Sequence, residues 1–168
     1  RIIQVGSTFI GGNQDFVVLR YNTDGSLDTS FGGGDGIVTT PIGTSYDIAH
    51  SVVVQTDGKI VVGGYYGVES FNNNFAVVRY AADGSLDTTF GGGDGIATTD
   101  FGGVDVVWSL ALQSDNKIVA AGGSGVTAAV VRYAADGSLD TSFSGDGMLM
   151  LPLNSGSYFC AMAVQSDG

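Results

Sequence analysis

The sequence contains few of the residues that most catalytic and metal sites use. Histidine, tryptophan, cysteine and glutamate each occur once. A single cysteine excludes a disulfide within the chain. One histidine and one cysteine also disfavour a zinc site, which takes three or four such ligands. No apolar run approaches the ~20 residues that a membrane-spanning helix needs, so we expect no membrane insertion.

Basic residues are scarce as well. Six bases stand against seventeen acids, which gives a net charge of −11. Nucleic acids bind basic surfaces, so we expect no nucleic-acid partner. Sixteen of the acids are aspartates, and glycine fills 28 positions. Because aspartate and glycine favour turns and helix-forming glutamate and lysine are rare, the composition predicts strands, tight turns and no helix.

An eight-residue motif divides the chain into three similar units. Its copies are Asp24–Phe31, Asp83–Phe90 and Asp136–Phe143, spaced by 59 and 53 residues. Each unit is about 56 residues long, a period typical of repeat architectures. The charges follow the repeat, so they do not mark one asymmetric active site. The six bases occupy two unit positions: Arg1, Lys59 and Lys117 at one, and Arg20, Arg79 and Arg132 at the other.

Each unit predicts four strands, rich in the valine, isoleucine and aromatic residues that strands favour. Asp57-Gly58 and Asp115-Asn116 predict tight hairpins from a fourth strand into the next first strand, because such turns need positive φ. The predicted first strands are Arg1–Gly6, Lys59–Gly64 and Lys117–Gly122, and the second strands are Phe16–Tyr21, Phe75–Tyr80 and Ala128–Tyr133. The third strands are Gly36–Thr40, Gly95–Thr99 and Gly147–Met150, and the fourth strands are Ile48–Gln55, Val106–Gln113 and Tyr158–Gln165.

The two ends of the sequence complement each other. Ser166-Asp167-Gly168 followed by Arg1-Ile2-Ile3 reproduces the hairpin of Thr56–Val61. We therefore expect the first and last strands to have open edges, which promote association. Residues 1–168 are interpreted as one repeat domain and a segment of a larger propeller or array. The expected partners are a second copy of the chain or adjoining repeats.

The chain resembles the delta-60 repeat over nearly its whole length. The residues that carry the resemblance are Phe75–Tyr80, Asp83–Phe90 and Gln113–Gly122. The resemblance implies a β-propeller-like domain of a large secreted or cell-surface bacterial protein, with no settled activity. The third unit departs from the pattern, because its glycine-rich loop is one residue shorter and Ala128 stands where the other units have phenylalanine.

The predicted fold class is all-β, with three four-stranded antiparallel repeat units as β-propeller blades. Four short strands suit a blade, and complete propellers have four to eight blades. A β-trefoil, which also has three four-stranded units but closes within one chain, is the alternative.

The aspartates of the motif and of the following loop are candidate calcium ligands. Calcium takes six to eight oxygens from carboxylates and loop carbonyls. The alternative is turn formation, in which an aspartate accepts a hydrogen bond from the backbone N–H two residues on. The candidates are Asp24, Asp28, Asp35, Asp83, Asp87, Asp94, Asp136, Asp140 and Asp146. Apart from calcium, the sequence predicts no cofactor.

The segment after the first strand of the second unit is a candidate glycan site. Aromatic and amide side chains could stack on a sugar and hydrogen-bond to it. The segment also varies in length between units, as an ordinary surface loop does. The candidate ligand residues are Tyr65, Tyr66, Glu69, Phe71 and Asn72.

Two further sets of residues have both a functional and a structural interpretation. His50, Trp108 and Cys160 occupy one repeat position, either a catalytic histidine and nucleophilic cysteine or a half-buried strand position. Alternation along the strand places that position on the face of Val52. Arg20, Arg79 and Arg132 either pair with loop aspartates of their own units or form a cationic ring that binds an anion. We favour the structural interpretation in both cases and predict no catalytic residue.

The sequence thus predicts a non-enzymatic structural or interaction module of a secreted or cell-surface protein. A carbohydrate- or calcium-binding module that uses the variable or Asp/Gly-rich loops is the alternative.

Overall fold

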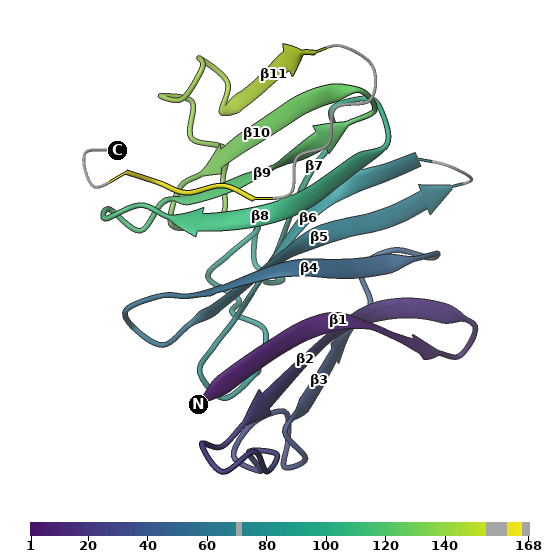
Figure 1. Cartoon of the computed structure of the whole chain (residues 1–168), viewed down its shortest axis with the longest axis vertical. Coiled ribbons are helices and arrows are strands. Elements are labelled where there is room, and N and C mark those ends of the chain that lie inside the picture. Colours follow the sequence, from purple (N-terminus) through teal and green to yellow (C-terminus); the bar gives the residue numbers. More distant parts are fainter. Residues whose placement is uncertain (70–71, 154–160, 166–168) are drawn as a thin grey trace.

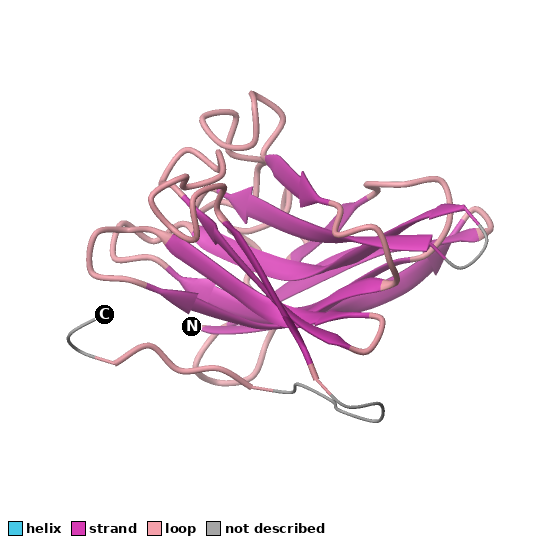
Figure 2. Cartoon of the chain, turned by 90° about the horizontal axis from the view of Figure 1, so that it is seen from above, coloured by secondary structure: helices cyan, strands magenta, loops and turns pink. Residues whose placement is uncertain are grey.

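The computed structural model describes all residues except 70–71, 154–160 and 166–168. The described residues form strands and loops without a helix, as the composition predicts (Figure 2). In consequence, no described segment is a helix of the length and apolarity that crossing a membrane requires. The all-β prediction is therefore confirmed for the described part of the chain.

The strands form three antiparallel sheets, which follow one another along the long axis of the molecule (Figure 1). The first sheet contains β1 (Ile2–Ile10), β2 (Asn13–Tyr21) and β3 (Ile37–Thr40). The second sheet contains β4 (Asp47–Val54), β5 (Ile60–Glu69), β6 (Asn72–Tyr80) and β7 (Ile96–Thr99). The third sheet contains β8 (Asp105–Leu112), β9 (Ile118–Ser124), β10 (Thr127–Tyr133) and β11 (Met148–Pro152).

Each four-stranded sheet combines strands from two sequence units. β4, the last strand of the first unit, pairs with β5 of the second unit, with Val52 opposite Val62. β8 pairs with β9 in the same way, with Leu110 opposite Ala120. No described pairing joins β3 to β4, so each sheet boundary falls between the third and fourth strands of a unit. The sheets are propeller blades, offset by one strand from the sequence repeat.

The first sheet has three strands, and β1 lies at its open edge, as expected. The fourth strand predicted at Tyr158–Gln165 is wrong in its described part, because residues 161–165 form no ladder. These residues run beside β8 (Figure 1), and the backbone N–H of Met162 donates to Ser109 Oγ at 3.1 Å. A strand needs a partner for its backbone groups, and no described first strand pairs with this segment. The start of the predicted strand lies outside the described residues.

The predicted hairpin turns are confirmed by their backbone angles. Gly58 has a φ of 86° and Asn116 has a φ of 65°, the positive values that short hairpin turns require. The prediction of a loop after the first strand of the second unit is largely wrong. β5 continues to Glu69 and β6 begins at Asn72, so this segment is an extended hairpin.

The apolar core fills the two junctions between sheets. The second sheet is buried on both faces, which explains the continuous burial of residues 74–80 in β6, as expected for a strand covered on both sides. The main core residues of the first junction are Phe16, Val18, Phe31, Ile60, Val62, Val78 and Tyr80. Those of the second junction are Val61, Phe75, Val77, Phe90, Ile118, Val131 and Tyr133.

Candidate functional site

An arginine in the second strand of each unit is held by an aspartate of the following loop. The distance from arginine Nε to aspartate Oδ2 is 2.7 Å in all three units. The first base of each unit approaches the same carboxylate, at 2.8 Å for Arg1, 3.1 Å for Lys59 and 3.4 Å for Lys117. The pairs are Arg20–Asp28, Arg79–Asp87 and Arg132–Asp140. The predicted pairing within each unit is thus confirmed.

Each guanidinium also lies over the last phenylalanine of the motif. The distance from Cζ to the ring centroid is 4.5 Å for Phe31, 4.6 Å for Phe90 and 5.0 Å for Phe143. Nη1 of Arg20 and Arg79 donates to a backbone carbonyl of the next unit, at Ala82 and Ala135 respectively. These two arginines therefore connect neighbouring sheets. The guanidinium groups that an anion site would need are already bound to groups of the protein.

The nine candidate calcium ligands all act as turn acceptors. In each case Oδ1 accepts a hydrogen bond from the backbone N–H two residues on, at 2.9–3.1 Å. This confirms the turn interpretation of the Asp-rich loops. No three His, Cys, Asp or Glu residues of the described chain are grouped to hold a metal ion, and calcium binding stays an alternative for titration to decide.

The carboxylates of the ion pairs are held in the charged form. Burial raises the pKa of Asp87, but hydrogen bonds from Thr89 and Lys59 and the charge of Arg79 outweigh it, and the pKa lies well below its ordinary value. Hydrogen bonding from Ser142 is the main cause that lowers the pKa of Asp140 to about 2. Groups with such low pKa values are poor general acids near neutral pH.

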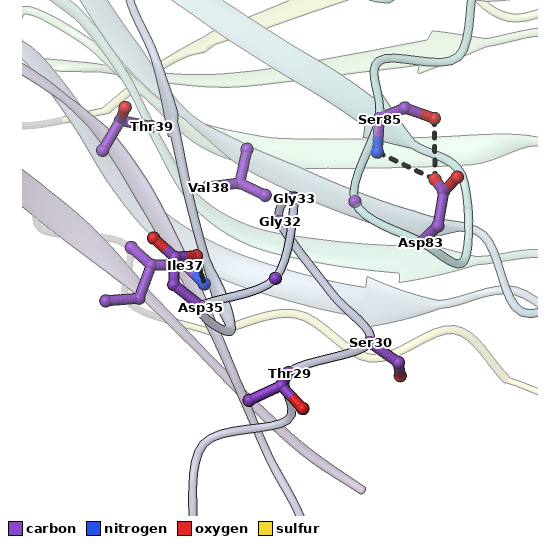
Figure 3. A pocket seen from close by; sticks show the side chains of 12 residues that line it. Thr29, Ser30, Gly32, Gly33, Asp35, Ile37, Val38, Thr39, Asp83 and Ser85 are labelled. Atoms are coloured by element: carbon purple, nitrogen blue, oxygen red, sulfur yellow. Dashed lines mark hydrogen bonds between the residues drawn. The ribbon is translucent and has the colours of Figure 1, made fainter.

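Two equivalent clefts open where the Asp/Gly-rich loops meet the next unit. The first has a volume of about 860 Å³ and lies between the loop 32–35 with β3 and the turn 83–85 (Figure 3). The second, between the second and third units, has a volume of about 630 Å³. Asp83 Oδ1 accepts hydrogen bonds from the backbone N–H and the hydroxyl of Ser85, at 2.9 and 2.7 Å. The clefts are lined by serine and threonine hydroxyls, glycine backbone, aspartates and apolar side chains, and the second also contains Tyr133.

The candidate glycan ligands are not gathered on a surface loop. Tyr65 and Tyr66 lie in β5 and are half-buried. The hydroxyl of Tyr66 accepts a hydrogen bond from Asn74 Nδ2 at 3.3 Å. Asn72 is exposed at the start of β6, Phe71 lies outside the described residues, and Glu69 ends β5. Extension of the hairpin has thus placed both tyrosines in the sheet, which the sequence prediction missed.

His50 and Trp108 meet across neighbouring sheets. Their ring centroids are 4.3 Å apart, and Tyr65 lies 5.7 Å from His50. The ladders of β4 and β8 shift register at these two residues, so a β-bulge breaks the predicted alternation. Cys160, the third member of the position, lies outside the described residues. His50 therefore sits in an aromatic contact, and its buried Nε2 has no hydrogen-bond partner among the described residues.

This burial predicts a pH dependence of stability. Burial lowers the pKa of His50 below its ordinary value of 6.5, so the unfolded chain takes up a proton at higher pH than the folded chain. The contribution of neutral His50 to the free energy of unfolding is therefore fully present above pH 6.5 and is lost as the pH falls towards the pKa of the folded chain. We expect His50→Phe to remove this part of the decline in melting temperature from about pH 8 to about pH 5. Identical pH profiles for the two proteins would contradict it.

Two buried carboxylates were not identified from the sequence. Asp47 and Asp105 are fully buried at the start of β4 and β8. Oδ2 of Asp47 accepts from the backbone N–H of Ile42 and Gly43, at 2.7 and 2.9 Å. Burial raises the pKa of both aspartates. Their recurrence in two units was the available signal, but a strand-initial aspartate looks like any turn residue.

Comparison with known proteins explains why the same contacts recur. A family model described as "Domain of unknown function (DUF5122) beta-propeller" matches residues 1–31, 55–90 and 113–143, more than half of the chain. The chain belongs to this β-propeller family. The matched segments contain the first two strands of each unit and the motif that supplies the aspartate and phenylalanine around each arginine. The DUF5122 family is related to the delta-60 repeat, and the narrower delta-60 name stays a prediction. A search of curated proteins found no match.

Proposed function

We propose that this DUF5122 propeller segment is a non-enzymatic structural and interaction module of a larger propeller or array. The recurrent ion pairs and turn aspartates support this, because their polar groups are engaged in holding the sheets together. A location in a secreted or cell-surface bacterial protein is part of the proposal and rests on the resemblance to the delta-60 repeat. The proposed binding element is the open edge of the first sheet.

The state of β1 carries this proposal. β5 and β9 each pair with strands on both sides, whereas β1 pairs with β2 alone in the described structure. Ile2 and Phe9, on β1, are 59% and 66% exposed. An open edge presents unpaired N–H and C=O groups, and an extended chain can pair with them by strand addition. β1 is therefore suited to bind a strand supplied by another polypeptide.

The test uses the strand that covers the equivalent edge of the second sheet. A synthetic peptide with the sequence of residues 47–55, which contains β4, is added to the chain, and a scrambled peptide serves as the control. We expect the first peptide to slow amide hydrogen exchange in residues 2–10, because strand pairing protects backbone N–H groups. Equal exchange with both peptides would exclude β1 as the binding edge.

The clefts favour a second candidate function, carbohydrate or calcium binding at the Asp/Gly-rich loops. Their repetition at both junctions and their hydroxyl lining would suit a repeating glycan. A ligand that binds only the folded chain raises its melting temperature. A rise at millimolar calcium, or a specific glycan-array signal, would favour this candidate over the first.

A further inference from the structure

The two junctions between sheets share one set of polar contacts. The backbone N–H of Gly32 donates to Asp83 O at 3.0 Å, and that of Gly91 donates to Asp136 O at 2.9 Å. The arginine contacts to Ala82 and Ala135 lie beside them. In both junctions the turn of one unit therefore supplies two adjacent carbonyls to two donors of the preceding unit.

The glycine of the same turn packs closely against the preceding unit. A Cβ added to Gly84 would lie 2.8 Å from a ring atom of Phe31, and one added to Gly137 would lie 2.8 Å from a ring atom of Phe90. Both phenylalanines are fully buried as a result. The junction thus accepts this turn only with a glycine at its tip.

The third sheet presents the same donors without acceptors. Arg132 Nη1 and the backbone N–H of Ser144 have the unit positions of the donors above, and neither reaches an acceptor among the described residues. Phe143 is only half-buried. Leu149 and Leu151, on β11, are 42% and 55% exposed. The outer face of the third sheet therefore has the donors and the apolar surface that bind a turn at the other two junctions, and no turn of the described chain lies there.

The first sheet presents the matching turn. Thr23 O and Asp24 O have the unit positions of Ala82 O and Asp83 O, and neither accepts a backbone hydrogen bond in the described structure. At the tip, Gly25 has a φ of +87°, and a Cβ added to it would meet nothing within 4 Å. This turn has the sequence and conformation of the docked turns, but its surroundings are empty.

The contacts between innermost strands indicate how many strands a docked sheet must supply. The backbone N–H of Leu110 in β8 donates to Ser51 Oγ of β4 at 3.0 Å. That of Met162 donates to the equivalent Ser109 Oγ at 3.1 Å. Residues 161–165 therefore lie where the innermost strand of a following sheet lies. Such a sheet would need three further strands with an open inner edge, and the sheet β1–β2–β3 has both properties.

If a first sheet packed on the third sheet, one contact would differ from those of the two described junctions, and the differing residues would compensate each other. The hydroxyls of Thr40 and Tyr80 lie 2.7 Å apart across the first junction, and the second junction repeats the pair. The third sheet has Leu151 at the threonine position. The tyrosine of the first sheet, Tyr21, instead donates to Gln4 Oε1 of its own sheet at 3.0 Å. An apolar partner thus leaves no hydroxyl without a hydrogen bond.

We propose that the first sheet of a second copy docks on the third sheet of this chain, head to tail. The turn around Gly25 of one copy supplies the carbonyls for Arg132 and Ser144 of the other, and residues 161–165 lie along β1. This names the partner of the β1 edge and so rests on the proposed interaction function. A head-to-tail interface closes into a ring or extends into a filament, depending on its rotation.

The test measures the solution mass of the 168-residue chain over a range of concentrations by sedimentation equilibrium. We expect masses above the 17.1 kDa of one chain. Gly25→Asn should weaken association at least about tenfold without unfolding the chain, since its side chain would clash only with the docked copy and asparagine tolerates positive φ. Gly125→Asn is the matched control, because Gly125 has a φ of +58° and equally open surroundings.

A chain that stays at 17.1 kDa throughout, or a Gly25→Asn variant that associates like the control, would overturn the inference. The peptide test on β1 separates this failure from failure of the proposed function. If the inference alone is wrong, the Gly25→Asn variant still binds the peptide of residues 47–55. If the proposed function is wrong, neither the unchanged chain nor the Gly25→Asn variant binds that peptide.

Discussion

Replacing Arg79 by methionine is expected to lower the free energy of unfolding by about 3–5 kcal/mol, because removal of one partner leaves a buried charge uncompensated. Arg79 is 4% exposed and is the partner of Asp87, which is also buried. Its Nη1 also connects the second sheet to Ala135 in the third. Urea denaturation of dilute protein measures the loss.

The equivalent arginine of the third unit provides a matched control. Arg132 pairs with Asp140 in the same geometry, but its side chain is 17% exposed and its Nη1 reaches no described carbonyl. Arg132→Met should therefore cost clearly less than Arg79→Met. Combining Arg79→Met with Asp87→Leu should recover part of the loss, since an apolar pair can replace a buried ion pair. Equal losses for the two arginines would show that the contact between sheets contributes nothing.

Replacing Gly91 by alanine is expected to have the largest effect of any single methyl addition in the glycine-rich loops. Gly91 has a φ of +65°, and a Cβ there would lie 1.9 Å from Ile96 O, a backbone atom that cannot move aside alone. We expect a loss above about 4 kcal/mol, which is diagnostic of such a clash, or failure to fold. Circular dichroism and thermal denaturation measure both outcomes.

The neighbouring glycine separates the clash from the backbone strain. Gly92 has a φ of +89°, but a Cβ there would meet nothing within 4 Å. Gly92→Ala should therefore cost only the ~1–2 kcal/mol of a left-handed alanine. Similar losses at Gly91 and Gly92 would mean that the close approach to β7 does not constrain the loop.

The sequence was sufficient to predict most of the strands, the hairpin turns and the roles of the recurring charges. Repetition made these features visible: Asp57-Gly58 and Asp115-Asn116 occupy the same unit position, and both adopt positive φ. The pairing of each arginine with a loop aspartate could also be predicted, because both recur together in every unit. Such features depend on residues close in sequence.

Features that depend on the details of strand pairing or on buried tertiary contacts could not be predicted. The turn at Asp57-Gly58 predicts the pairing of β4 with β5, but no residue pattern indicates that β3 and β4 stay unpaired, which moves the blade boundary by one strand. The bulges at His50 and Trp108 appear only where β4 and β8 meet their neighbours. Asp47 is fully buried and accepts hydrogen bonds from the backbone of residues 42–43, but in the sequence a strand-initial aspartate looks like any turn residue.

Cross-strand proton contacts measured by NMR test the blade arrangement most directly. The account predicts contacts between the backbones of Val52 and Val62, and between those of Leu110 and Ala120, with no ladder between β3 and β4. A ladder that joins β3 to β4, without the contact from Val52 to Val62, would contradict it.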